Sequence, residues 1–129
     1  MAETRKIKAP EIWPDAVPYW DAARDGKLLV KKCNSCGELY HYPRPFCPFC
    51  MSDDTEWFEC SGEGTIYTFS IMRRAPVPFA LAYVELAEGP RILTNIVECD
   101  FDALDCGQPV RLTFLPTEGG PPVPVFRPA

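Results

Sequence analysis

Apolar side chains recur along this chain in short runs, and the period of those runs changes from helical to extended near residue 28. Within residues 14–27, Trp20, Ala23 and Arg24 lie at helical spacing, so this segment predicts one or two short helices. Gly26 follows as a C-cap, because glycine readily adopts the left-handed backbone with which many helices end. We therefore expect the chain to begin with a small helical segment.

Strand signals dominate the remainder of the chain. Two of them, at residues 28–33 and 55–60, flank a cysteine-rich stretch in which residues 37–46 predict a strand, a turn and a return strand. From Gly62 onward, β-branched and aromatic residues form five further runs, at residues 64–74, 79–86, 91–99, 109–115 and 122–126. Five short strands, of which the first is the longest, suit a small barrel of the OB type. Periodicity alone does not separate this barrel from a small sandwich.

The cysteines carry the clearest chemical signal. Cys33 and Cys36 form one CxxC pair, and after ten intervening residues Cys47 and Cys50 form a second pair. Each CxxC turn places two thiolates on one side of a tight knuckle, and two facing knuckles give the tetrahedral four-sulfur site of structural zinc. Four protein thiolates leave no position for water or substrate. We therefore expect Zn²⁺ to shape the fold rather than to catalyse a reaction.

Two other interpretations of the cysteine pairs stay open. The first is iron in a rubredoxin-like site, because four-thiolate tetrahedra accept either metal. Rubredoxin-type knuckles carry glycine after each second cysteine; Gly37 fits that habit and Met51 does not. The second is a set of disulfides or free thiols. Metal binding has the advantage of explaining how so small a hairpin unit folds, since it contributes about 10–16 kcal/mol in zinc-finger peptides.

Composition narrows the class of protein further. The chain has 129 residues, of which 47% are hydrophobic and 15 are proline, which favours a compact, turn-rich β protein. It has no apolar run near the roughly 20 residues that span a bilayer, and its first residues lack an apolar signal core. We therefore expect a cytoplasmic protein without membrane association. Because the cytoplasm is reducing, we interpret the seven cysteines of the chain as metal ligands and buried thiols rather than as disulfides.

Charge argues against nucleic acid as a partner. The formal net charge is −5, divided into −1 over residues 1–58 and −4 over residues 59–129. Nucleic-acid binding depends on Lys and Arg contacts to phosphates, so the acidic second half opposes it, although zinc ribbons and OB-folds both occur in that role. Arg73 and Arg74 are two of only five positive charges in that half. Their guanidinium groups suit phosphate geometrically, and a solvated surface pair is the simpler alternative.

The remaining reactive side chains do not form a recognisable catalytic group. His41 is the only histidine, and we expect it to be structural because four thiolates already complete the metal site. Cys60, Cys99 and Cys106 lack paired spacing, so we interpret them as small buried residues or inert thiols rather than nucleophiles. The sequence contains no glycine-rich phosphate loop, no nucleophile elbow and no zinc-protease motif.

The order of these landmarks resembles a known family. The segments that carry the resemblance are PYWDAARDGKLLVKKCNSCGELYHYPRPFCPFC, SGEGTIYTFSIMRRAP, LAYVELAEGPRILTNIV and PVFRPA. Together they are similar to the acyl-CoA-associated family in which a rubredoxin-like zinc ribbon precedes an OB-fold, long catalogued as a domain of unknown function. The resemblance runs from residue 14 to the end of the sequence. The chain departs from the usual pattern at Met51, where a glycine is typical.

Pattern and resemblance together predict a mainly β protein in three parts. Short N-terminal helices are expected in residues 1–28, a rubredoxin-like zinc ribbon in residues 29–58, and a five-stranded OB-fold barrel in residues 59–129. By the resemblance, the metal ligands are Cys33, Cys36, Cys47 and Cys50. Arg73 and Arg74 are candidates for contacts with CoA phosphate or with a partner protein.

The resemblance also implies a function. Members of this family are small partners of thiolase-fold proteins such as thiolases, acyltransferases or retro-aldol lyases, and the thiolase-like chain carries the catalytic residues. By analogy this chain is a non-catalytic, zinc-binding subunit of an acyl-CoA-processing complex, in a hetero-oligomer with two copies of each chain. It would help to form the CoA channel and would not be active alone. The alternatives are a nucleic-acid-binding module and a rubredoxin-like electron carrier.

Overall fold

The computed structural model describes residues 7–129, so the start of the predicted first segment lies outside the described residues. The chain opens with a 3-10 turn, η1 (Pro14–Ala16), and one short helix, α1 (Val17–Arg24). Gly26 ends the helix as predicted: its φ is 77°, and its amide donates to the carbonyl of Ala23 over 3.0 Å. The expected short helices are therefore confirmed.

The zinc-ribbon part is a small antiparallel sheet. Strands β1 (Leu29–Cys33), β2 (Leu39–Tyr40) and β3 (Thr55–Glu59) pair in the order β2-β1-β3. The return strand predicted within residues 37–46 does not form, and residues 41–46 are a loop after β2. Pro43 and Pro45 explain this difference, because proline has no amide hydrogen to donate to a strand ladder.

The second half closes into a barrel. Its strands are β4 (Glu63–Met72), β5 (Phe79–Leu86), β6 (Arg91–Ile96), β7 (Pro109–Leu115) and β8 (Val123–Pro128). They pair in the order β4-β5-β6-β8-β7, and β7 returns to β4. All pairs are antiparallel except β6 with β8, and the short turn η2 (Phe101–Ala103) lies between β6 and β7. The predicted five-stranded OB-fold is confirmed, and closure excludes a sandwich.

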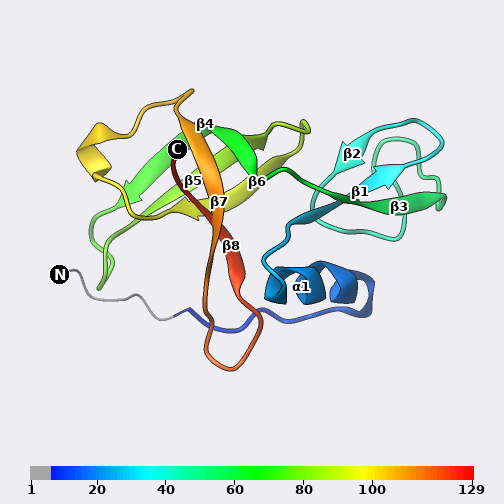
Figure 1. The fold of residues 1–129 in the computed structure, drawn as a ribbon, viewed down its shortest axis with the longest axis horizontal. Helices are drawn as coiled ribbons and strands as arrows, with labels where there is room; N and C mark the ends of the chain where they lie inside the picture. The colour runs from blue at the N-terminus through cyan, green and yellow to red at the C-terminus, as the bar shows by residue number, and fades with distance from the viewer. Residues whose placement is uncertain (1–6) are drawn as a thin grey trace.

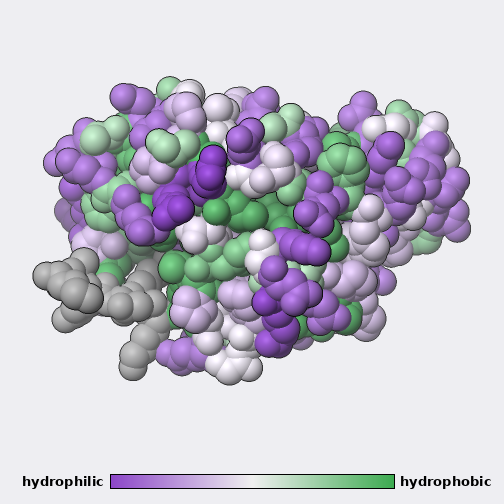
Figure 2. All heavy atoms as spheres, viewed as in Figure 1, coloured by the Kyte–Doolittle hydropathy of each residue, from purple (hydrophilic) through white to green (hydrophobic). Residues whose placement is uncertain are grey.

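One hydrophobic core joins the three parts. Alternate residues of the barrel strands point inward, and the same buried cluster continues through α1 and the start of β1; it includes Tyr19, Trp20, Leu28, Ile66 and Phe126. Figure 1 places α1 below the point where the ribbon meets the barrel, and Figure 2 shows hydrophobic atoms gathering in the middle of this face. The domain boundaries at residues 28 and 58 stay a prediction, since the core crosses both.

An aromatic clamp holds α1 against the ribbon. Tyr19 and His41 share a hydrogen bond between the phenol oxygen and Nε2 over 3.1 Å, and the Trp20 indole donates to the Tyr42 hydroxyl over 2.7 Å. The rings of Tyr19 and Tyr42 pack edge to face with centroids 5.3 Å apart. Burial lowers the pKa of His41 to about 4, so the imidazole is neutral at pH 7. The only histidine therefore serves the packing of the helix.

No helix within residues 7–129 is long and apolar enough to cross a membrane.

This clamp predicts an acid-sensitive stability. The folded-state pKa of His41, about 4, lies below its ordinary value of 6.5, so its contribution is complete above pH 6.5 and is lost as the pH falls toward 4. We expect His41→Gln, which keeps a hydrogen-bonding side chain but does not titrate, to remove up to roughly 3 kcal/mol of that pH dependence. Urea unfolding at several pH values measures it.

Tyr42→Phe is the matched control for this experiment. It removes the bond to Trp20 but leaves the imidazole in place, so its stability should fall with acid as steeply as that of the unmodified chain. The metal site also loses stability in acid, but it does so in every variant. The difference in unfolding free energy between a variant and the unmodified chain at one pH is therefore free of that contribution. Parallel curves for His41→Gln and the unmodified chain would contradict the role given to His41.

Candidate metal centre

The four predicted cysteines meet at the outer end of the ribbon. Cys33 ends β1, Cys36 lies in the turn that follows, and Cys47 and Cys50 lie in a second turn before β3. Their four sulfur atoms are all within 4.8 Å of one another. The Sγ–Sγ distance is 3.5 Å between Cys33 and Cys50 and 3.7 Å between Cys36 and Cys47.

These distances favour a metal site over disulfides. Zinc–sulfur bonds of about 2.3 Å in a tetrahedron place the sulfurs about 3.8 Å apart, whereas a disulfide needs about 2.05 Å. All four cysteines are free thiols in the structure. The sulfur donor set and its spacing therefore fit one tetrahedral ion, and four protein ligands would complete its coordination.

The two knuckles have the same backbone geometry. The carbonyl of Cys33 accepts the amide of Gly37 over 2.9 Å, and that of Cys47 accepts the amide of Met51 over 2.8 Å. Gly37 and Met51 occupy equivalent positions with φ of 78° and 65°. Met51 thus adopts the left-handed conformation that glycine usually supplies. Met51 in place of the usual glycine therefore raises the conformational free energy of this knuckle but leaves its backbone geometry unchanged.

Two backbone amides donate hydrogen bonds to cysteine sulfurs of the site. The Cys36 amide points at the Cys33 sulfur and the Phe49 amide at the Cys47 sulfur, each over 3.4 Å. The hydrogen bond from Cys36 is the largest cause that lowers the pKa of the Cys33 thiol to about 6. Metal binding requires the thiolate, so this hydrogen bond favours the binding form of Cys33, whereas the pKa values of Cys36 and Cys50 are raised in the same cluster.

The structure does not bring the other predicted site residues to the cysteines. Arg73 and Arg74 follow β4 in the turn toward β5, which Figure 1 places at the end of the barrel away from the ribbon. Arg73 forms an exposed ion pair with Asp102, with 2.9 Å between nitrogen and oxygen, and Arg74 is also exposed. Both remain candidates for an anion, and Arg73 would have to exchange Asp102 for it.

The other cysteines are not arranged as nucleophiles. Burial, followed by the nearby Glu88 carboxylate, raises the pKa of Cys60 to about 12, and burial raises the pKa of Cys99. Cys106 is exposed in a turn. Sequence patterns gave no sign of Glu88, which accepts a hydrogen bond from the Ser61 amide over 2.9 Å. That bond ties the β5–β6 turn to the segment that joins ribbon and barrel.

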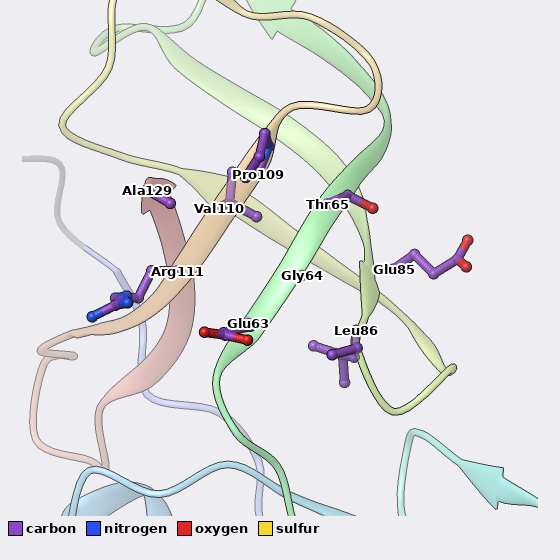
Figure 3. A pocket seen from close by; sticks show the side chains of 10 residues that line it. Glu63, Gly64, Thr65, Glu85, Leu86, Pro109, Val110, Arg111 and Ala129 are labelled. Atoms are coloured by element: carbon purple, nitrogen blue, oxygen red, sulfur yellow. The ribbon is translucent and has the colours of Figure 1, made fainter.

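A hollow of about 510 Å³ on the barrel gives no sign of catalysis. It lies between β4, β5 and β7, and its lining includes Glu63, Glu85, Leu86, Val110 and Arg111. In Figure 3, Glu63 and Arg111 lie on one side of β4, whereas Glu85 points away on the other side. The charged groups do not converge on a common point, so no acid–base pair is formed there.

A four-cysteine ribbon and a closed OB barrel on one core define a zinc-ribbon/OB-fold protein. The family models agree with this class: residues 20–56 match the rubredoxin-like zinc ribbon domain of ChsH2, and residues 57–115 match its C-terminal OB-fold domain. The chain belongs to the ChsH2/DUF35 family. The family resemblance inferred from the sequence is thereby confirmed.

Several named proteins are similar to this chain. A DUF35 domain-containing scaffold protein of Methanocaldococcus jannaschii is 34% identical over 67% of each chain. The benzoylsuccinyl-CoA thiolase subunit BbsA of Geobacter metallireducens is 31% identical over 88% of this chain and 84% of its own. A probable enoyl-CoA hydratase alpha subunit of Thermomonospora curvata is 36% identical over 93% of this chain, which spans only 39% of that relative.

A solved structure extends the likeness to three dimensions. One chain of the Ltp2-ChsH2(DUF35) aldolase superposes with a TM-score of 0.83 and is 35% identical to this protein. The match covers 92% of this chain and 98% of that one. The arrangement of ribbon and barrel is therefore shared along almost the whole length of both chains.

The thiol geometry predicts one zinc ion per chain. We expect Cys33→Ser to lose most of the bound metal and to unfold the ribbon, because metal binding supplies folding free energy to so small a sheet. Cys106→Ser is the matched control, since this cysteine is exposed and far along the chain from both knuckles, and it should retain the metal. Elemental analysis measures both. A red protein that contains iron and bleaches on reduction would contradict zinc.

The conformation of Met51 predicts a stabilising substitution. Its φ of 65° costs a non-glycine residue about 1 kcal/mol, and its side chain is 71% exposed and makes little packing contribution. We expect Met51→Gly to raise the free energy of unfolding by several tenths of a kcal/mol, after the entropy that glycine adds to the unfolded chain. Met51→Ala should give no such gain. Denaturant unfolding with zinc present compares them, and a destabilised Met51→Gly would contradict the strain.

Proposed function

We propose that this chain is a non-catalytic, zinc-binding scaffold subunit that assembles with a thiolase-fold protein in an acyl-CoA-processing complex. The observation that carries the proposal is its correspondence with the ChsH2(DUF35) chain of an aldolase complex, at 35% identity over 98% of that chain. The similarity to a thiolase subunit and to archaeal scaffold proteins supports the same role.

The chemistry of the described residues supports a partner as the source of catalysis. The four thiols of the ribbon would be saturated by one metal ion. His41 is neutral and packed between aromatic rings, and Cys60 holds its proton to about pH 12. A general base or nucleophile needs a pKa near the working pH, and neither side chain has one.

We further propose that the chain helps to bind CoA in the assembled complex. Arg73 and Arg74 remain the candidates, because guanidinium groups pair well with phosphate. They lie next to each other directly after β4, and of the two only Arg73 has an acidic partner within ion-pair distance among residues 7–129. Arg74 is therefore the better placed of the two to contact a phosphate or a carboxylate of the partner.

A second candidate function is attachment to an enoyl-CoA hydratase. The hydratase relative is 36% identical but much longer, so the sequence shared with this chain is one part of a larger subunit. In that case the scaffold would serve hydration of an acyl-CoA rather than carbon–carbon bond cleavage or formation. Both candidates share a CoA ester as substrate of the complex, and they differ in the fold of the partner.

Assembly is the property that separates these candidates. We expect the purified chain to have no thiolase, aldolase or hydratase activity, and to co-elute with a thiolase-fold subunit from the native genome as two copies of each chain. Light scattering measures the stoichiometry, and turnover of acyl-CoA with and without this chain measures its effect on the partner. Co-elution with a hydratase subunit alone would favour the second candidate. A thiolase-fold subunit that is stable, fully active and unbound would refute the first.

A further inference from the structure

An apolar platform covers the outer face of three barrel strands. Tyr83 on β5 lies opposite Thr68 on β4 and Leu93 on β6, so these side chains share one face. A bulge at residues 66–68 of β4 adds Tyr67 to that face as an extra outward residue. Tyr67, Tyr83 and Leu93 are 50%, 45% and 54% exposed. Three large apolar side chains at half exposure form a contiguous patch rather than isolated surface residues.

Arg91 holds this platform in a fixed arrangement. It lies on β6, and its guanidinium carbon is 3.9 Å from the centre of the Tyr67 ring on β4, so the side chain crosses β5. Its Nε donates to Glu85 on β5 over 3.3 Å. An arginine already ordered by stacking and an ion pair loses little freedom when a partner covers it. Arginine and tyrosine in such settings are the residue types enriched at binding hot spots.

The platform continues onto the zinc ribbon. Arg91 also lines a groove of about 330 Å³ between the β5–β6 turn and the ribbon, together with Glu38, Leu39, Phe49, Glu88, Gly89 and Pro90. Figure 1 shows that turn extending toward β2. Phe49 belongs to the second cysteine knuckle and is 65% exposed. We call the surface made by Phe49, Tyr67, Tyr83, Arg91 and Leu93 the ribbon–barrel face.

The size of this face suits a stable interface with another protein. Large apolar and aromatic side chains bury roughly 150–250 Å² when fully covered, so four of them at half exposure offer about 400 Å². The largest apolar patch on a typical monomer is about 300–600 Å² and is often functional. A standard interface buries about 800 Å² per partner, of which a little over half is apolar. The face therefore supplies most of the apolar area that one such interface needs.

Charge decides which occupant fits. Glu38 lines the groove as an exposed acid, Arg91 is already paired with Glu85, and the Glu88 carboxylate is turned toward the Ser61 amide. The acidic character of the rim therefore comes from Glu38 on a chain of net charge −5. A second copy would place acidic rims opposite each other, and nucleic acid would bring phosphates toward carboxylates; both are unfavourable. A protein with an apolar patch bordered by Lys and Arg is complementary.

We propose that the ribbon–barrel face is the surface on which the thiolase-fold subunit docks, with basic residues of that subunit facing Glu38. The inference rests on the proposed function and adds where the contact is made and what chemistry the partner presents. The shared core would contribute to docking, because the face is continuous only while the core keeps the ribbon and the barrel in their relative positions.

Substitution of Leu93 tests the proposal. The probe is the purified thiolase-fold subunit that co-elutes with the unmodified chain. Leu93→Asp is expected to raise the Kd of the complex at least 30-fold, the scale of one hot-spot residue, and Tyr83→Ser to raise it as well. Val17→Asp is the matched control, since Val17 is 42% exposed on α1, outside the face. Its Kd should change less than 3-fold. Unchanged zinc content and circular dichroism establish that each variant is folded.

Charge provides an independent arm. Glu38→Lys is expected to slow association and to weaken the dependence of the association rate on salt, because long-range attraction to a basic partner is reduced. Glu11→Lys makes the same charge change at an exposed N-terminal position and should leave the association rate within 2-fold. Faster association of Glu38→Lys would overturn the acidic-rim argument.

The outcomes separate this inference from the proposed function. If no thiolase-fold subunit binds the unmodified chain, the proposed function fails and the docking surface fails with it. If the subunit binds the chain and Leu93→Asp equally well, only the docking surface is wrong, and loss of binding by Val17→Asp would move the contact to α1. A dimer of the chain alone that Leu93→Asp dissociates would assign the face to a second copy. Binding of single-stranded nucleic acid that the same substitution abolishes would also overturn the proposal.

Discussion

The core that α1 shares with the ribbon and the barrel is the constraint on which the other features depend. An eight-residue helix has no stability of its own in water, so α1 persists only because Tyr19 and Trp20 are buried in that core. The same two side chains bond to the loop at His41 and Tyr42. Through them, the position of the ribbon is tied to the barrel beside which the helix packs.

The ribbon needs this support and a metal because it is so small. Units below about 40 residues rarely bury enough apolar surface to fold without disulfides, metals or partners. Its own buried cluster within the described chain is limited to Cys33, Tyr40 and Cys47, two of which are sulfur donors. The metal would therefore complete the outer end of the ribbon, while the shared core secures its base. The left-handed conformation of Met51 is accompanied by the hydrogen bond from its amide to the carbonyl of Cys47.

Much of this arrangement could be predicted from the sequence. Period, turn residues and β-branched runs identified the helix and the barrel strands, since each of these signals is local, whereas the choice of an OB barrel over a sandwich rested on the family resemblance. The CxxC spacing identified the four sulfurs that converge within 4.8 Å. Local signals could not show that residues 41–46 form a loop that packs on a helix some 22 positions away. They also missed the Arg91–Tyr67 stack and the Glu88 bond to Ser61, because these depend on strand register and on which turn meets which strand.

The missed contacts bear on function more than the predicted ones. The cysteine cluster, in which Cys33 and Cys47 are buried and Cys36 and Cys50 are exposed, and the His41 imidazole, which bonds to Tyr19, act within the chain, so they stabilise the fold. Arg91 and Phe49 are on different parts of the molecule and both line one groove, and the bonds at Cys60, Ser61 and Glu88 add to the shared core in holding these parts together. In this view the metal influences assembly by position: it fixes the knuckle that carries Phe49, and the core fixes that knuckle relative to the barrel. If the proposed face is the docking surface, loss of the metal would weaken docking through the position of Phe49, without a change to the barrel side of that face.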